Sequence, residues 1–220
     1  RRRHTRYWRD WSSDVCSSDL RLLRAECGVE SAEGSALVLE LLEGLEARTG
    51  PEADGARAAW ALAAKEDALG ARAARLRAGG SADAGRTVFL EKAEGSCLRC
   101  HRVGDQGVSE VGPRMDGVGS RLTTDQLLES ILEPNTTLAQ GYQSWTFALA
   151  DGTVLVGRIL SEGRDGLVVL DAEGQEHELG PDDVEARRKD VSAMPSDLAE
   201  KLSDRELRDL TAYLKSLQDS

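Results

Sequence analysis

Apolar positions in the first part of the chain repeat at helical spacing. Leucines lie four residues apart within 35–45, which predicts an amphipathic helix there. Gly50-Pro51 ends this pattern, and an alanine-rich segment over about 56–78 predicts a second helix. Two or three such helices with short connections are typical of the tail of a helical-repeat array. The sequence therefore predicts a helical, repeat-like segment over residues 21–80.

The rest of the chain combines helical patterns with a change of period in its middle. Residues 143–180 contain short apolar segments, of which the first alternates apolar and polar residues, and turns with glycine lie between them. This pattern predicts an antiparallel sheet of four or five strands. Helices are expected at about 82–93 and 122–132, and Ser203 and Glu206 form a capping box before a last helix. The expected fold is mainly α with a small inserted antiparallel β-sheet.

The first twenty residues differ from everything that follows them. They are basic and rich in aromatic residues, and they repeat Ser-Ser-Asp without a helix or strand period. Residues 1–20 therefore resemble a non-native leader or a disordered linker, and we leave them out of the fold. The remaining chain is expected to divide into the helical segment over 21–80 and a domain over 81–220, with the sheet at 143–180 inserted in that domain.

Charge and hydropathy exclude two classes of partner. Lys and Arg number 28 against 39 Asp and Glu, so the net charge is −11. Proteins that bind nucleic acid usually carry a basic face, so we expect no nucleic-acid partner. No apolar run approaches the roughly 20 residues that a membrane-spanning helix requires, and we expect no membrane span in this chain.

Cys97, Cys100 and His101 form a Cys-x-x-Cys-His motif. This motif is the attachment signature of c-type haem, in which two thiols on one turn bind the haem covalently and the histidine binds its iron. Two alternatives stay open. A zinc site would need more ligands, and Cys27 and His177 are the candidates that remain. A thiol redox pair would follow a strand in a βαβ unit, whereas a helix is predicted before this motif.

The sixth ligand of such an iron would come from one of the two methionines. Met115 follows His101 too closely for the chain to reach the other face of a haem. Met194 precedes the last helix, and Pro195 after it favours an extended loop. With the sheet regarded as an insertion, the chain between His101 and Met194 has a suitable length to enclose a haem. The expected iron ligands are therefore His101 and Met194.

These motifs together resemble the C-terminal haem-binding domain of planctomycete and verrucomicrobial proteins. The resemblance covers about 81–217 and rests on the haem motif and on Gly112-Pro113, Pro134-Asn135, Gly141-Tyr142, Ser192 to Pro195 and Leu210 to Leu214. It implies a class I cytochrome c fold at the end of a long chain with a dehydrogenase-like β-propeller and helical repeats upstream. The sequence departs from the family at Arg114-Met115, where the family usually has an acidic residue and Leu.

The resemblance also implies roles for single residues. The carbonyl of Pro113 is expected to hold the N–H of the His101 ring. Gly85 is expected to let the first and last helices of the domain cross closely, with Phe89 near Tyr213. Three further positions either contact haem propionates or the loop of the methionine, or are purely structural, and both alternatives stay open: Asn135, Tyr142 and Trp145.

The function expected from these features is electron transfer through one covalent haem c with His/Met ligation, and not enzymatic catalysis by this chain. An upstream dehydrogenase domain would be the donor and another cytochrome the acceptor, in the periplasm or another extracytoplasmic compartment. One alternative is a haem-based sensor in which a small ligand displaces Met194. Another is a structural adaptor whose sheet, similar to a small SH3-like or Sm-like barrel, docks partners.

Overall fold

A computed structural model of the chain describes residues 39–40, 42–66, 72–73, 75–93, 95–107 and 110–219. The chain divides into two compact units, with the boundary between Gly79 and Gly80. The leader expected over 1–20 and the first part of the repeat-like segment lie outside the described residues, and so does Cys27. The candidate site lies in the second unit.

The described part of the first unit is helical. Residues 42–46 are helical, and α3 (Pro51–Glu66) follows after a short turn. We expected this helix to start near residue 56, but it starts at Pro51, because proline suits the first helical position, where no N–H partner exists. The Arg57 guanidinium donates hydrogen bonds to the carbonyls of Leu45 at 2.7 Å and Arg48 at 2.9 Å, which ties the turn to α3.

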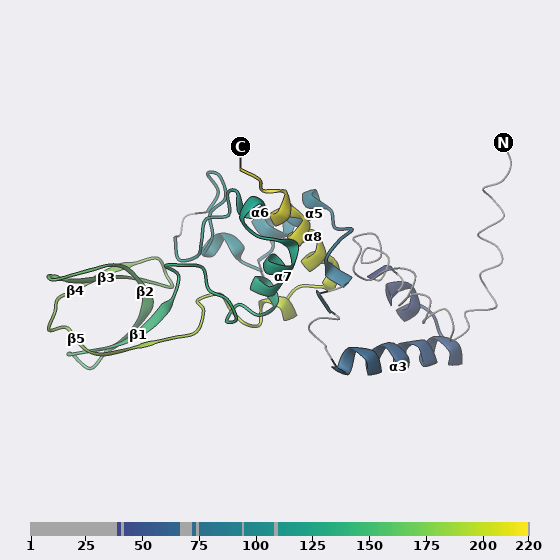
Figure 1. The fold of residues 1–220 in the computed structure, drawn as a ribbon, viewed down its shortest axis with the longest axis horizontal. Helices are drawn as coiled ribbons and strands as arrows, with labels where there is room; N and C mark the ends of the chain where they lie inside the picture. The colour runs from purple at the N-terminus through teal and green to yellow at the C-terminus, as the bar shows by residue number, and fades with distance from the viewer. Residues whose placement is uncertain are drawn as a thin grey trace. The chain divides into compact units, whose positions relative to one another are not determined.

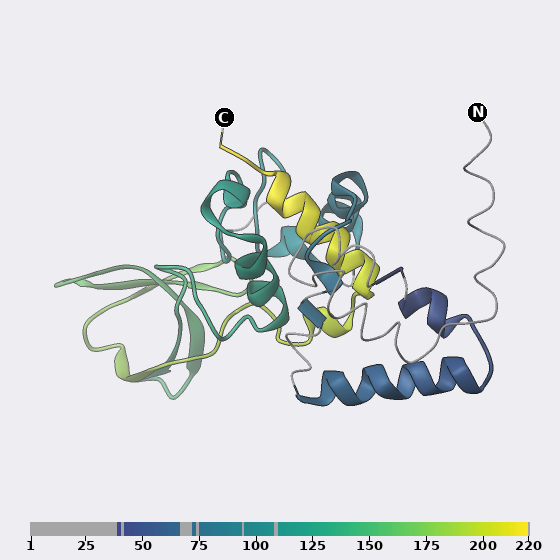
Figure 2. The ribbon, with the colours of Figure 1, turned by 45° about the vertical axis from the view of Figure 1, so that its right-hand side comes forward.

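Among the described residues of the second unit, three α-helices pack against a fourth, α8 (Asp204–Ser216). It contacts α5 (Ala82–Glu91), α6 (Val118–Arg121) and α7 (Thr124–Leu132), as Figures 1 and 2 show. Two short 3-10 turns, η1 (Cys97–Arg99) and η2 (Leu198–Glu200), connect these helices to the loops. The buried side chains between the helices are mostly leucine and aromatic: Phe89, Leu127, Leu128, Leu207, Leu210, Tyr213 and Leu214.

The crossing of α5 and α8 depends on a glycine. A Cβ atom on Gly85 would lie 1.9 Å from the carbonyl oxygen of Asp209, so a larger residue would push the helices apart. The rings of Phe89 and Tyr213 pack with their centroids 5.7 Å apart and their planes tilted by 54°. The expected close crossing of the two helices, with Phe89 beside Tyr213, is confirmed.

The middle of the second unit forms a five-stranded antiparallel sheet, β4-β3-β2-β1-β5. Its strands are β1 (Ser144–Leu149), β2 (Val154–Gly163), β3 (Gly166–Asp171), β4 (Glu176–Leu179) and β5 (Val184–Lys189). The strands form a curled sheet (Figure 1). The sheet has its own apolar core of Phe147, Val169 and Leu179, with partly buried neighbours such as Trp145 and Ile159. The sheet is therefore a second packed layer with a core separate from that of the helices.

This architecture corrects the expected fold class. We expected a mainly α chain with a class I cytochrome c fold and a helical-repeat fragment, but the structure is a mixed helix and sheet protein. The sheet also extends beyond the expected end at residue 180, because β5 follows it and pairs with β1. Charged residues fill β5 apart from Val184 and Ala186. An exposed edge strand of this kind lacks the apolar alternation on which the prediction relied.

Candidate functional site

Cys97, Cys100 and His101 lie on one tight turn that follows α5 after residues 92–96. The turn begins with η1 and closes with hydrogen bonds from the N–H groups of Cys100 and His101 to the Cys97 carbonyl, at 3.2 Å and 2.9 Å. Ser96 enters the turn in the left-handed conformation, with φ +45°. Both thiols are free and half-buried. The local fold thus presents two cysteine side chains and a histidine within a single turn of chain.

The His101 ring is held by the carbonyl of Pro113. Nδ1 of His101 lies 2.7 Å from that oxygen, and because a carbonyl only accepts hydrogen bonds, Nδ1 carries the proton and Nε2 has a free lone pair. Burial lowers the pKa of His101, and the hydrogen bond to Pro113 opposes this shift only in part. The ring is therefore a neutral imidazole at pH 7, which is the form that binds metals. The contact expected between Pro113 and His101 is present.

Gly112 lies close to the same ring. A Cβ atom at this position would lie 2.7 Å from Cε1 and 2.8 Å from Nδ1 of His101. The Gly112 N–H donates to the carbonyl of Cys100 at 2.7 Å, so the loop is joined to the cysteine turn by its backbone as well. The Gly112-Pro113 pair thus acts on the His101 ring in two ways. The glycine lets the loop come close to the ring, and the proline carbonyl accepts the hydrogen bond from Nδ1.

The pKa values of both thiols lie above the usual value of a cysteine. Burial raises the pKa of Cys97 to about 11. Burial also raises the pKa of Cys100, although the nearby Arg99 acts in the opposite direction. Reactive redox cysteines have lowered pKa values and sit beside positive charge or at helix N-termini. The turn therefore does not have the electrostatics of a thiol redox pair.

Met115 and Met194 lie in different surroundings. Met115 is buried at 8% exposure, and its N–H donates to the carbonyl of Arg102 at 2.8 Å. Its neighbour Arg114, the other departure from the family pattern, is exposed and pairs with Asp116. Met194 is half-buried on the loop between β5 and η2. Met115 is thus part of the packed core, whereas Met194 occupies a loop.

Hydrogen bonds from two sides hold the loop that carries Met194. The N–H of Met194 donates to Oγ of Ser192 at 3.1 Å, and the N–H of Ser192 donates to Oδ1 of Asn135 at 2.8 Å. At the sheet end, the N–H of Asp190 donates to the carbonyl of Ser144 at 2.9 Å. Asn135 therefore contacts the methionine loop, which is one of the two roles expected for it.

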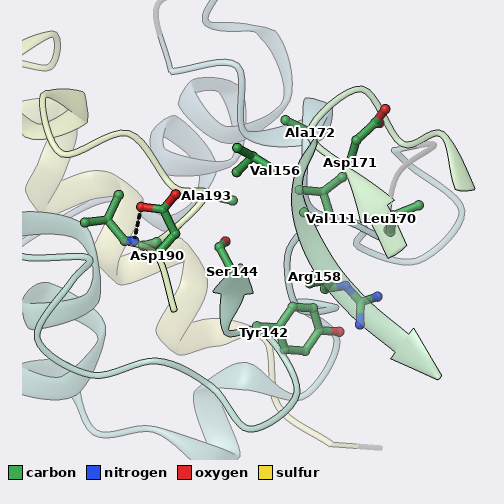
Figure 3. Close-up of a pocket in the computed structure, with 13 residues that line it drawn as sticks. Val111, Tyr142, Ser144, Val156, Arg158, Leu170, Asp171, Ala172, Asp190 and Ala193 are labelled. Atoms are coloured by element: carbon green, nitrogen blue, oxygen red, sulfur yellow. Dashed lines mark hydrogen bonds between the residues drawn. The ribbon is translucent and has the colours of Figure 1, made fainter. Parts of the chain in front are cut away.

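The segments that lead to Pro113 and to Met194 line one cavity. Its volume is about 120 Å³, and Val111, Tyr142 and Ala193 lie in its wall with residues of β2 and β3. Figure 3 shows Val111 and Ala193 on different segments around this space. Val111 precedes Pro113 by two residues and Ala193 directly precedes Met194. The fold thus brings a residue near Pro113, which holds the His101 ring, and the residue before Met194 to one cavity.

Tyr142 and Trp145, the other expected site residues, contact cationic side chains. The guanidinium of Arg158 lies 4.5 Å from the centroid of the Tyr142 ring, at the wall of the cavity (Figure 3). Trp145 packs against the apolar core of the sheet, with Arg187 5.2 Å and Lys189 5.9 Å from its ring centroid. These contacts favour a structural role for Trp145 and place only Tyr142 at the cavity.

Sequence reasoning missed several contacts around the site. Arg158 on β2 donates to the carbonyl of Glu110, and Nη1 of Arg102 lies 3.7 Å from the Glu110 carboxylate. His177, one of the candidate zinc ligands, is half-buried, and its Nε2 lies 2.7 Å from Oδ2 of Asp171. A single charged residue in a strand gives no sequence signal of its partner. The pair of Arg158 and Glu110, which lie 48 residues apart in sequence, depends on where the sheet docks.

Two searches of the described residues give negative results. No group of three or more His, Cys, Asp or Glu side chains among them is arranged to hold a metal ion. None of the described helices has the length and apolar character needed to cross a bilayer. Comparison with known proteins adds no relative: no family model matches the chain, and no curated protein matches it either.

Proposed function

We propose that the chain binds one haem covalently through Cys97 and Cys100, with His101 as an iron ligand, and carries single electrons. The observation that supports this most strongly is the hydrogen bond of 2.7 Å between His101 Nδ1 and the Pro113 carbonyl, on the same turn as two free thiols. It leaves Nε2 with a lone pair and fixes the ring, as a haem ligand requires. The donor set therefore fits a c-type haem.

Met194 is the sixth ligand in this proposal. It lies on a loop held by Asn135 and Ser192, and the residue before it shares a cavity with Val111. Met115 is less suitable, because its side chain is buried in the core. A thioether ligand raises the reduction potential of a haem iron. With His101 and Met194 both as ligands, the iron would have no open position for a substrate, which favours electron transfer over catalysis.

When bound, the haem supplies an iron that accepts and releases one electron. The chain's own residues orient and insulate it. Pro113 holds the His101 ring through its carbonyl oxygen, and Gly112 lets the loop lie close to that ring. The net charge of −11 favours approach of partners with basic faces. A dehydrogenase domain as donor and a second cytochrome as acceptor, outside the cytoplasm, complete the proposal.

The two methionines provide the experiment. The haem-loaded full chain should show the weak ferric absorption at the red end of the visible spectrum that Met-to-iron charge transfer gives. Met194→Ala should abolish this band, lower the reduction potential and open the iron to carbon monoxide. Met115→Leu is the matched control and should change none of these, because it preserves side-chain volume in the core and costs at most about 1.5 kcal/mol.

Three results would contradict parts of the proposal. Loss of the band in Met115→Leu alone would make Met115 the ligand. No effect in either variant would mean that the iron has no methionine ligand. Reversible displacement of Met194 by carbon monoxide in the reduced, unmutated protein would favour a haem-based sensor over an electron carrier.

A further inference from the structure

Arg158 connects the sheet to the loop that holds His101. It lies on β2, opposite Ser144 of β1. Its guanidinium donates two hydrogen bonds to one acceptor, the carbonyl of Glu110, at 2.7 Å from Nη2 and 3.2 Å from Nε. The same group lies 4.5 Å from the centroid of the Tyr142 ring (Figure 3), which restricts its orientation. Because two N–H groups of the rigid, planar guanidinium bind the same oxygen, the guanidinium fixes the position of the Glu110 carbonyl.

Glu110 lies three residues before Pro113, whose carbonyl holds the His101 ring. It precedes Val111, Gly112 and Pro113 directly. Gly112 touches the His101 ring, and Pro113 accepts the hydrogen bond from Nδ1. From the other side, Arg102, which follows His101 in the chain, pairs with the Glu110 carboxylate. A movement of the Glu110 carbonyl would therefore be transmitted through three residues to the acceptor of the His101 proton.

We infer that Arg158 is a positioning residue, through which the sheet sets the strength of the His101–Pro113 hydrogen bond and so the reduction potential of the haem. This inference depends on the proposed function. A stronger hydrogen bond at Nδ1 makes Nε2 more basic, and a more basic ligand favours ferric over ferrous iron. The sheet is thus a part of the electron-transfer site although it supplies no iron ligand.

The test compares Arg158→Gln with Arg187→Gln in the haem-loaded full chain. Arg187 is a matched control, because it also lies on the sheet over an aromatic ring, that of Trp145, and pairs at 2.9 Å with Glu162. Both variants lose one positive charge. Loss of a nearby charge alone lowers the potential, since it favours the more positive ferric iron. Loss of positioning weakens the hydrogen bond at His101 and raises the potential.

We expect Arg158→Gln to raise the potential, with the ratio of ferrous to ferric protein at fixed poise increasing about threefold, while Arg187→Gln does not raise it. A second readout is the rate at which the His101 Nδ1 proton exchanges with water, measured by NMR in the reduced protein. It should be several times faster in Arg158→Gln and unchanged in Arg187→Gln. This readout separates a loosened hydrogen bond from an effect of charge.

A fall in potential, or unchanged proton exchange, in Arg158→Gln would overturn the inference. Arg158→Lys, which keeps the charge but not the two-pronged donor, should also raise the potential. A wild-type potential in Arg158→Lys would show that charge alone is sufficient and would overturn the inference too. Failure of every variant and of the unmutated chain to take up haem would instead contradict the proposed function, so the two failures are distinguishable.

Discussion

The candidate site depends on a small residue that lets the backbone lie close to the His101 ring. This residue is Gly112, whose missing side chain lets the loop lie against His101 while the next residue accepts the hydrogen bond from the ring. The backbone of Gly112 is joined to Cys100 as well. Both parts of the site, the cysteine turn and the imidazole, thus depend on one position without a side chain.

Substitution of this glycine should disturb the site directly. In Gly112→Ala, the new Cβ would lie 2.7 Å from the His101 ring, so either the ring or the loop must move. We expect a loss of about 1–3 kcal/mol in the free energy of unfolding, measured by urea titration, together with a shifted Soret band in the haem-loaded protein. Gly163→Ala is the control, because a Cβ there meets no atom within 4 Å. Equal behaviour of the two variants would contradict this account of Gly112.

The residues of the site differ in how far sequence predicts them. The spacing of Cys97, Cys100 and His101 carries its own signal, because all three act within one turn. The contact of Pro113 was expected from the resemblance to a family. Arg158 could not be predicted, since its role depends on where a strand docks against a loop 48 residues away in sequence. Local patterns do not encode such distant contacts.

At the scale of elements, the residues at the start of α8 both cap this helix and contact the end of α5. Ser203 and Glu206 form a complete capping box, as their spacing predicts. The Glu206 carboxylate also pairs with Lys92, the residue that follows α5. Hydrogen bonds, first from Lys92 and then from the N–H of Ser203, lower the pKa of Glu206. One carboxylate thus supports both the helix end and the joint between α5 and α8.

The lowered pKa of Glu206 gives a pH dependence with a definite sign. Because the folded pKa lies below the usual value of 4.5, the ionised side chain stabilises the fold above that value, and this contribution is lost as the pH falls through the folded pKa. We expect Glu206→Gln to lose about 1 kcal/mol at pH 7. Its stability should also fall less steeply than that of the unmutated chain between about pH 5 and pH 3. Parallel curves from urea titrations over this range would contradict the assignment.

The elements themselves were predicted unevenly. β1, in which apolar residues alternate, and β3, which is a short apolar run, were recognised because their inward side chains form the core of the sheet. The edge strand β5 was missed, because most of its side chains are exposed and charged. The start of α3 was placed too late, since Pro51 was taken only as a helix terminator. Proline ends one helix and begins the next equally well.

At the scale of the whole molecule, the sheet has an apolar core of its own. Its core of Phe147, Val169 and Leu179 is separate from the core of the helices, which makes the chain a mixed helix and sheet protein. The prediction of a mainly α fold was wrong because it treated the helices as the whole framework. Contacts at Glu110 and Ser192 instead join the sheet and its exit segment to the loops of the candidate site.

The central claim is that Cys97 and Cys100 bind one haem covalently, and mass spectrometry under denaturing conditions tests it most directly. After expression with a haem-attachment system, the full chain should gain the mass of one haem, which should survive extraction with acid and acetone. Replacement of both Cys97 and Cys100 by Ala should abolish the added mass, whereas Cys16→Ala and Cys27→Ala should retain it. Haem that extracts freely from the unmutated chain, or zinc bound in its place, would contradict the claim.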